Sequence, residues 1–139
     1  MDILTSIPVA VYDGQHISRV IESVNERISR RAYENFVARG CVEGHSVEDW
    51  LDAERETIIR LTPVVSVDPQ DIIVEVLLPE VDLPNVAVHI APSQILISSD
   101  IDEDGLQICQ VIDLPFEVSM DGVDAEQTRN IIRITAALA

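Results

Sequence analysis

The residues best suited to chemistry form an acidic run, Asp-Ile-Asp-Glu-Asp-Gly, from Asp100 to Gly105. This run matches the first half of an EF-hand loop, in which alternate carboxylates bind calcium. The loop also needs a bidentate glutamate at its twelfth position, and that position is Val111. Two interpretations stay open: a solvated acidic turn that protects a sheet edge, or weak calcium binding by the remaining oxygen ligands.

Motifs for other metal sites and for catalysis are not found. His16, His45 and His89 lie far apart, without the close His or Cys spacing of a zinc site. Cys41 and Cys109 form no C-x-x-C pair and predict two reduced thiols. There is no nucleophile elbow or phosphate-binding loop, and the carboxylate spacing singles out no acid–base pair. We therefore expect no catalytic, cofactor-binding or metal-binding residues, no cofactor, and a protein that is not an enzyme.

Charge excludes several classes of partner. The 139-residue chain has a formal net charge of −16, and its nine basic residues are all arginines. Residues 1–61 carry 11 acidic and seven basic residues, whereas residues 62–139 carry 14 and two. Nucleic acids and anionic membranes repel such a protein. No apolar run reaches the ~20 residues of a membrane span, and the N-terminus lacks the basic start of a signal peptide, so we expect a cytoplasmic protein.

Residues 1–61 predict a helical hairpin. Apolar residues recur at helical spacing from Ile17 to Val37, and Gly40 is expected to end this first helix. A second helix is expected from Ser46, its N-cap, to Leu61, since Pro63 prevents continuation. Its predicted apolar face comprises Val47, Trp50, Leu51, Ile58 and Leu61. Tyr33, Phe36 and Trp50 form either the hairpin core or an exposed patch for a partner, and whether the hairpin packs on the rest of the chain stays open.

Residues 62–139 predict strands instead. β-Branched residues alternate with period two, and turn residues separate short apolar runs. The expected strands cover residues 64–67, 72–78, 86–90, 95–98 and 106–114, with a last one around 131–136. An irregular stretch is expected from Pro115 through Asp124, and His89 is expected to face solvent or the hairpin. The predicted fold class is mainly β: an antiparallel β-sandwich at 62–139 that follows a helical hairpin region at 1–61.

Four segments resemble one known family. These are Leu78-Pro79-Glu80-Val81-Asp82, Asn85–Val88, Gln94–Ser98, and Val111–Pro115 followed by Val123-Asp124. In this order they resemble the α-crystallin domain of small heat-shock proteins, over about residues 63–135. Separately, residues 28–56 are similar to a short bacterial helical domain of unknown function.

The resemblance implies a small heat-shock-protein-like chaperone. Such a stress-response protein holds exposed apolar segments of unfolding client proteins without ATP, in grooves at the sandwich edge and between the sheets. The chain departs from the family at Glu80, where glycine is usual, and at the short Ser99–Gly105 connection, where bacterial members exchange a long loop between subunits. A large cage-like oligomer is therefore not expected, although a homodimer is. The alternative is a non-assembling interaction or co-chaperone module with one dedicated protein partner.

Overall fold

A computed structural model describes residues 4–6, 9–11, 14–78, 85–128 and 130–139, with only the backbone described before residue 15. Two short strands open the described chain, β1 (Leu4–Ser6) and β2 (Val9–Val11). Two helices follow, α1 (Gly14–Ala38) and α2 (Ser46–Thr57). The remaining elements are β3 (Ile58–Ile59), β4 (Pro63–Val67), β5 (Asp71–Leu77), β6 (Ala87–Ala91), β7 (Gln94–Ser98), β8 (Gln107–Asp113), β9 (Asp124–Thr128) and β10 (Ile131–Ala137).

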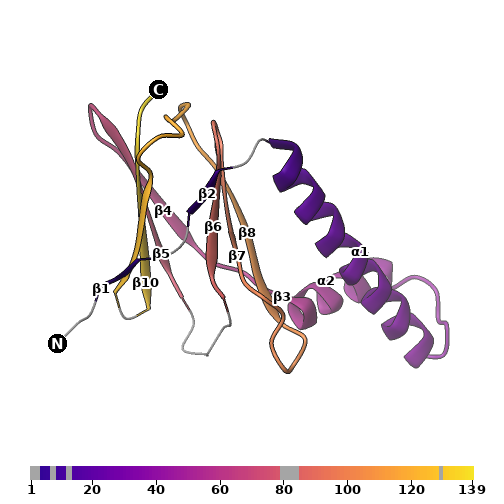
Figure 1. The fold of residues 1–139 in the computed structure, drawn as a ribbon. Helices are drawn as coiled ribbons and strands as arrows, with labels where there is room; N and C mark the ends of the chain where they lie inside the picture. Colours follow the sequence, from indigo (N-terminus) through magenta and orange to yellow (C-terminus); the bar gives the residue numbers. More distant parts are fainter. Residues whose placement is uncertain (1–3, 7–8, 12–13, 79–84, 129) are drawn as a thin grey trace.

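The strands form two five-stranded sheets, which we call sheet A and sheet B. Sheet A has the order β1-β9-β10-β5-β4, and sheet B has the order β2-β6-β7-β8-β3. Most neighbours are antiparallel, but β2 pairs with β6 and β3 pairs with β8 in parallel. Figure 1 shows the two sheets face to face, with the helices beyond sheet B. The predicted class, a mainly β sandwich with an N-terminal helical hairpin, is confirmed.

Aliphatic side chains between the sheets form the main core. On β5, Ile72, Val74 and Val76 are buried and alternate with more exposed residues, as expected for a strand with one face inward. Valine and isoleucine suit this position because their branched side chains pack well on a pleated surface. Ile132 and Ile134 of the neighbouring strand β10 are buried in the same cluster. The opposing residues of sheet B are also buried: Val88, Ile90, Ile95, Ile97, Ile108 and Ile112.

The helical hairpin packs on the outer face of sheet B. Ile17, Val24 and Ile28 of α1 form a second buried cluster with Leu96 of β7 and Cys109 of β8. As a result β7 is covered on both faces, and its continuous apolar run Ile95–Ile97 is completely buried. The sequence left the position of the hairpin open. The structure places it on the chain's own sandwich, as a third layer (Figure 1).

Three predictions for the second helix are wrong. It ends at Thr57, not Leu61, because Ile58 and Ile59 leave the helix and pair with β8. Its buried residues are Asp49, Ala53 and Thr57, whereas Val47 and Leu51 of the predicted apolar face are exposed. The four-residue spacing of the buried set turns this side toward α1 and sheet B, and the small side chain of Ala53 permits close approach. Ser46 is not the N-cap either: His45 takes that position, without a side-chain capping bond.

Besides β3, three strands were not predicted. β1 and β2 lie in the N-terminal region, and β9 has the polar sequence Asp-Ala-Glu-Gln-Thr, which carries little strand propensity. β9 begins at Asp124, the end of the stretch expected to be irregular, and is held by β10 on one side and β1 on the other. The strands that the sequence predicted correspond to β4–β8 and β10, and each end agrees to within one residue. The Leu-Pro turn expected at residues 79–82 lies outside the described residues.

Candidate functional site

β4 is an open edge of sheet A. Among the described residues it pairs with β5 alone, so one side of its backbone is left without a partner strand there. Pro63 stands at its first position, where a residue without an N–H group is tolerated at a sheet edge. Val64 and Val67 expose 61% and 45% of their surface on this strand. An edge with unpaired backbone groups and exposed valines can accept another extended chain as an additional strand.

Next to this edge, the outer face of sheet A has an apolar pair. Leu77 and Ile131 lie directly opposite each other on β5 and β10, and both are exposed. No helix covers this face in Figure 1, in contrast to the outer face of sheet B. Beyond the pair, the face is polar, with Glu75 opposite Arg133. We call Val64, Leu77 and Ile131 the sheet A apolar surface. Val67, paired with the buried Ile72, lies on the other face of β4, at the exposed end of the strand.

The other three sheet ends are formed by shorter strands. β1 adds to β9 at the other end of sheet A, and β2 adds to β6 at the neighbouring end of sheet B. The N-terminal segment therefore crosses from one sheet to the other on this side of the sandwich (Figure 1). On the opposite side, β3 covers part of β8 through only two residues. Among the described edge strands β4 is thus the longest, with five residues against three, three and two, and offers an added strand the most pairing positions.

The far end of the hairpin carries a second apolar surface. Tyr33 is 65% exposed, and its ring lies 6.2 Å from the ring of Phe36 between centroids. Both line a pocket of about 370 Å³ with Val42, between α1 and the loop before α2. Trp50 is partly buried against the cluster under α1 instead. Both interpretations of the aromatics therefore hold in part, since Trp50 belongs to the hairpin core and Tyr33 to an exposed patch.

Carboxylate oxygens of the acidic turn accept hydrogen bonds from other groups of the chain. Asp102 Oδ1 accepts hydrogen bonds from the backbone N–H groups of Asp104 (2.8 Å) and Leu106 (2.9 Å). Asp100 Oδ2 accepts one from the side-chain amide of Asn85 (2.6 Å). These bonds close a tight connection between β7 and β8. In the described part of the chain, no group of three His, Cys, Asp or Glu side chains is arranged to hold a metal ion.

The histidines and cysteines do not form a reactive site. His89 faces the hairpin, as one of the two expectations stated: its ring lies 5.6 Å from that of His16 between centroids, and its Nε2 is 2.8 Å from Ser98 Oγ. Burial lowers the pKa of His89, and the nearby His16 adds to this effect. Cys41 is exposed, Cys109 is buried, and both are free thiols. Burial raises the pKa of Cys109 against the opposing effect of Arg60, which makes it a poor nucleophile.

The sequence signals for these surfaces were partial. The sequence names Tyr33 and Phe36 as candidates for a partner surface, but it predicts the valines of β4 only as part of a strand. Their exposure follows from the position of β4 at the end of sheet A, which local sequence does not reveal. Pro63 was the one available signal, because proline at the start of a strand favours an edge position. Neither helix in the described residues is long and apolar enough to cross a bilayer.

The chain is similar to known proteins in part of its sequence and in its fold. Residues 24–57, which cover most of the hairpin, match a family model described as "Protein of unknown function (DUF2934)". No curated protein matches the sequence. The fold is similar to that of heat shock protein 16.0 from Schizosaccharomyces pombe, with a TM-score of 0.50 and 15% identity over 70% of this chain and 87% of that chain. At this identity the likeness concerns the fold alone, and it supports an α-crystallin-like β-sandwich beneath the helical hairpin.

Proposed function

We propose that the protein is an ATP-independent holdase that binds exposed apolar segments of unfolding proteins. The observation that carries the proposal is the open β4 edge with its two exposed valines, on a sandwich similar in fold to a small heat shock protein. An unfolding client exposes extended apolar segments with unpaired backbone groups. Such a segment can add to β4 through main-chain hydrogen bonds, and its side chains can contact the sheet A apolar surface.

Charge supports the same proposal. The net charge of −16 repels other copies of the protein and keeps its complex with an aggregation-prone client in solution. Apolar burial supplies the affinity, at roughly 25 cal/mol for each Å² of apolar surface removed from water. A few exposed apolar residues therefore give weak, reversible capture. This strength suits a holdase, which must later release its client.

The second candidate is a non-assembling module that binds one dedicated partner. The observation in its favour is the coverage of sheet B and of the strands beside the N-terminus by the chain's own elements, which leaves few sites for indiscriminate binding. The Tyr33–Phe36 pocket would then be the first surface to examine. With either candidate we propose a cytoplasmic, non-enzymatic protein that is at most a small oligomer. The division at residues 61 and 62 likewise remains our proposal.

The proposal is tested by heating an unrelated enzyme with the full chain at stoichiometric ratios, without ATP. Light scattering reports aggregation of the enzyme, and circular dichroism confirms that the protein itself stays folded. Suppression of scattering that is unchanged by added ATP supports the holdase. Full aggregation of the enzyme in the presence of folded protein rejects the holdase and favours the dedicated module.

A further inference from the structure

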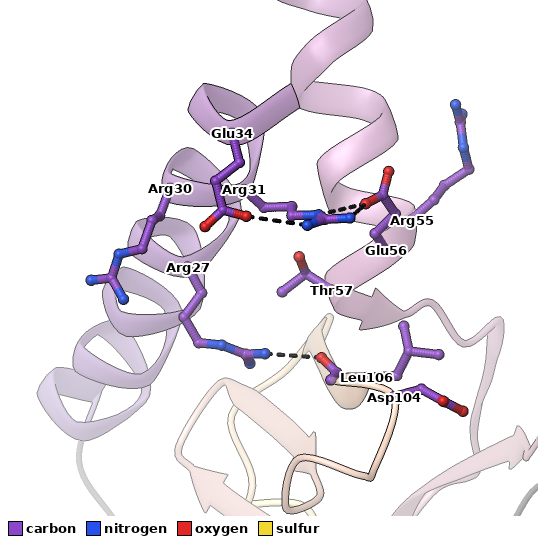
Figure 2. Close-up of a pocket in the computed structure, with 10 residues that line it drawn as sticks. Arg27, Arg30, Arg31, Glu34, Arg55, Glu56, Thr57, Asp104 and Leu106 are labelled. Atoms are coloured by element: carbon purple, nitrogen blue, oxygen red, sulfur yellow. Dashed lines mark hydrogen bonds and ion pairs between the residues drawn. The ribbon is translucent and has the colours of Figure 1, made fainter. Parts of the chain in front are cut away.

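A cavity of about 550 Å³ lies where the hairpin meets the turn between β7 and β8. Four of the nine basic residues border it: Arg27, Arg30 and Arg31 on α1, and Arg55 on α2. Figure 2 shows Arg27 reaching from α1 toward the β7–β8 turn and Arg31 reaching toward α2. The volume is in the range of small-molecule sites. Such a concentration of positive charge is unexpected in a chain with a net charge of −16.

Two of the four arginines are neutralised by carboxylates. Arg31 lies between both helices, with Nη2 2.5 Å from Glu56 Oε2 and Nη1 3.1 Å from Glu34 Oε2. These hydrogen bonds, the one to Glu56 first, raise the pKa of Arg31. Arg55 forms an ion pair with Asp52 of the same helix. The Arg31–Glu56 pair joins the two helices, and the charges of Arg31 and Arg55 are both explained without a ligand.

The other two arginines, Arg27 and Arg30, have no carboxylate partner in the part of the chain that the structure describes. Arg27 donates hydrogen bonds to the carbonyl oxygen of Gly105 (3.0 Å) and to the side-chain oxygen of Gln107, both uncharged acceptors. Arg30 stands at the rim, and within the described residues it forms no ion pair (Figure 2). Arg27, Arg30 and Arg31 are spaced by three and four residues, so their charges lie on one side of α1 and repel one another. The fold keeps this repulsion although acidic residues are abundant.

Contact with the acidic β7–β8 turn does not explain why the arginines are grouped at this cavity. The turn offers one carboxylate to the cavity, that of Asp104, and no ion pair joins it to Arg27 or Arg30 in the described chain. Arg27 binds the turn through a carbonyl group instead. A glutamine could form this contact without the cost of a buried charge. The positive charge of Arg27 and Arg30 is therefore available for something outside the chain.

We infer that the cavity binds a small oxyanion with two or more closely spaced negative charges, of the polyphosphate or polycarboxylate class. Guanidinium groups bind phosphate and carboxylate oxygens through paired, charge-assisted hydrogen bonds. Arg27 and Arg30 border the cavity from α1, and Thr57 borders it from the end of α2. Such a ligand contacts both the hairpin and the β7–β8 turn, so its binding also stabilises the docking of the hairpin on sheet B.

The test is isothermal titration of the full chain with pyrophosphate and, separately, with citrate at low ionic strength. We expect saturable 1:1 binding of at least one probe, which weakens as salt is added. The double variant Arg27→Gln/Arg30→Gln should weaken binding about tenfold or more. Arg19→Gln/Arg133→Gln removes the same two charges outside the cavity and should leave the affinity within about twofold. Which probe binds more tightly separates the phosphate source from the carboxylate source.

Two single variants keep the inference testable if Arg27 proves necessary for folding. Arg30 contacts no partner in the described chain, so Arg30→Gln should weaken binding about threefold with no change in the thermal midpoint. Asp104→Asn removes a like charge from the ligand's surroundings and should tighten binding about threefold. The inference is overturned if neither probe binds saturably, if the control double variant loses as much affinity as the cavity variant, or if Asp104→Asn has no effect.

Discussion

The imidazole ring of His16, in the first turns of α1, lies 5.6 Å from that of His89 on β6, between ring centroids. This pair stands where the helix meets the outer face of sheet B. Burial lowers the pKa of His89 below its ordinary value of 6.5, and a positive His16 lowers it further. The unfolded chain therefore binds more protons than the folded chain when the pH is below about 6.5. Stability attributable to His89 is complete above this pH and decreases as the pH falls.

The first prediction follows from the loss of stability at low pH that the lowered pKa of His89 implies. The thermal midpoint of the wild type should decrease more between pH 7.5 and 5.5 than that of His89→Gln, whose amide can still bond to Ser98. Differential scanning fluorimetry of both proteins in matched buffers measures the difference. Acidification also reduces repulsion among the carboxylates, but this effect is common to the two proteins. Equal decreases would show that His89 does not titrate in a buried position.

The second prediction concerns the docking of the hairpin. Ile28 is 1% exposed and packs with Leu96 beneath α1, so Ile28→Ala should lower the free energy of unfolding by about 2–5 kcal/mol. Val37→Ala, on the exposed side of the same helix, should change it by no more than about 0.5 kcal/mol. Urea unfolding followed by circular dichroism measures both. Equal, small effects would mean that α1 is not packed on sheet B.

The pattern of apolar residues predicts a strand correctly where the strand carries that pattern in its own sequence. The strands β5 to β8 could be predicted because each carries its own alternating or continuous apolar run. β9 could not, because Asp-Ala-Glu-Gln-Thr is a strand only through its neighbours β10 and β1. The end of α2 was misplaced for the same reason. Ile58 and Ile59 suit a helix face as well as a strand, and pairing with β8, 49 residues later at Ile58, decides between them.

The candidate surfaces were less predictable than the fold. Val64 and Val65 are identical in type, yet Val65 packs against the core and Val64 is exposed. This difference depends on which face of β4 meets the other sheet. Likewise, the arginines of α1 could be read only as a charged helix side until the β7–β8 turn was placed beside them. Contacts between distant segments create both surfaces, and a single sequence does not specify those contacts.

The third prediction concerns a buried ion pair in the hairpin. The carboxylate of Asp49 is almost fully buried and pairs with Arg39, near the end of α1. Arg39→Ala should lower the free energy of unfolding by about 3 kcal/mol, because it leaves a buried charge without its partner. Arg39→Ala/Asp49→Ala removes both charges and should recover part of this loss. Urea unfolding of the two variants measures the coupling, and a double variant less stable than Arg39→Ala would contradict it.

The fourth prediction concerns the N-terminal strands. Deletion of residues 1–12 removes β1 and β2 and leaves the longer strands β9 and β6 as the open edges in their place. Open edges pair with other chains, so the deletion variant should form larger species than the full chain at the same concentration. Size exclusion coupled to light scattering gives the mass of each. Identical masses, with circular dichroism unchanged, would show that β1 and β2 do not protect these edges.

The central claim is that clients bind at the open β4 edge. The most direct measurement compares suppression of heat-induced enzyme aggregation by the wild type, by Val64→Lys/Val67→Lys, and by Val37→Lys/Val47→Lys. The two variants make the same change at pairs of exposed valines, on β4 and on the hairpin respectively. Lysine on an edge strand opposes the addition of another strand. We predict that only the β4 variant loses suppression. Equal suppression by all three folded proteins, or a loss confined to the hairpin variant, would contradict the claim.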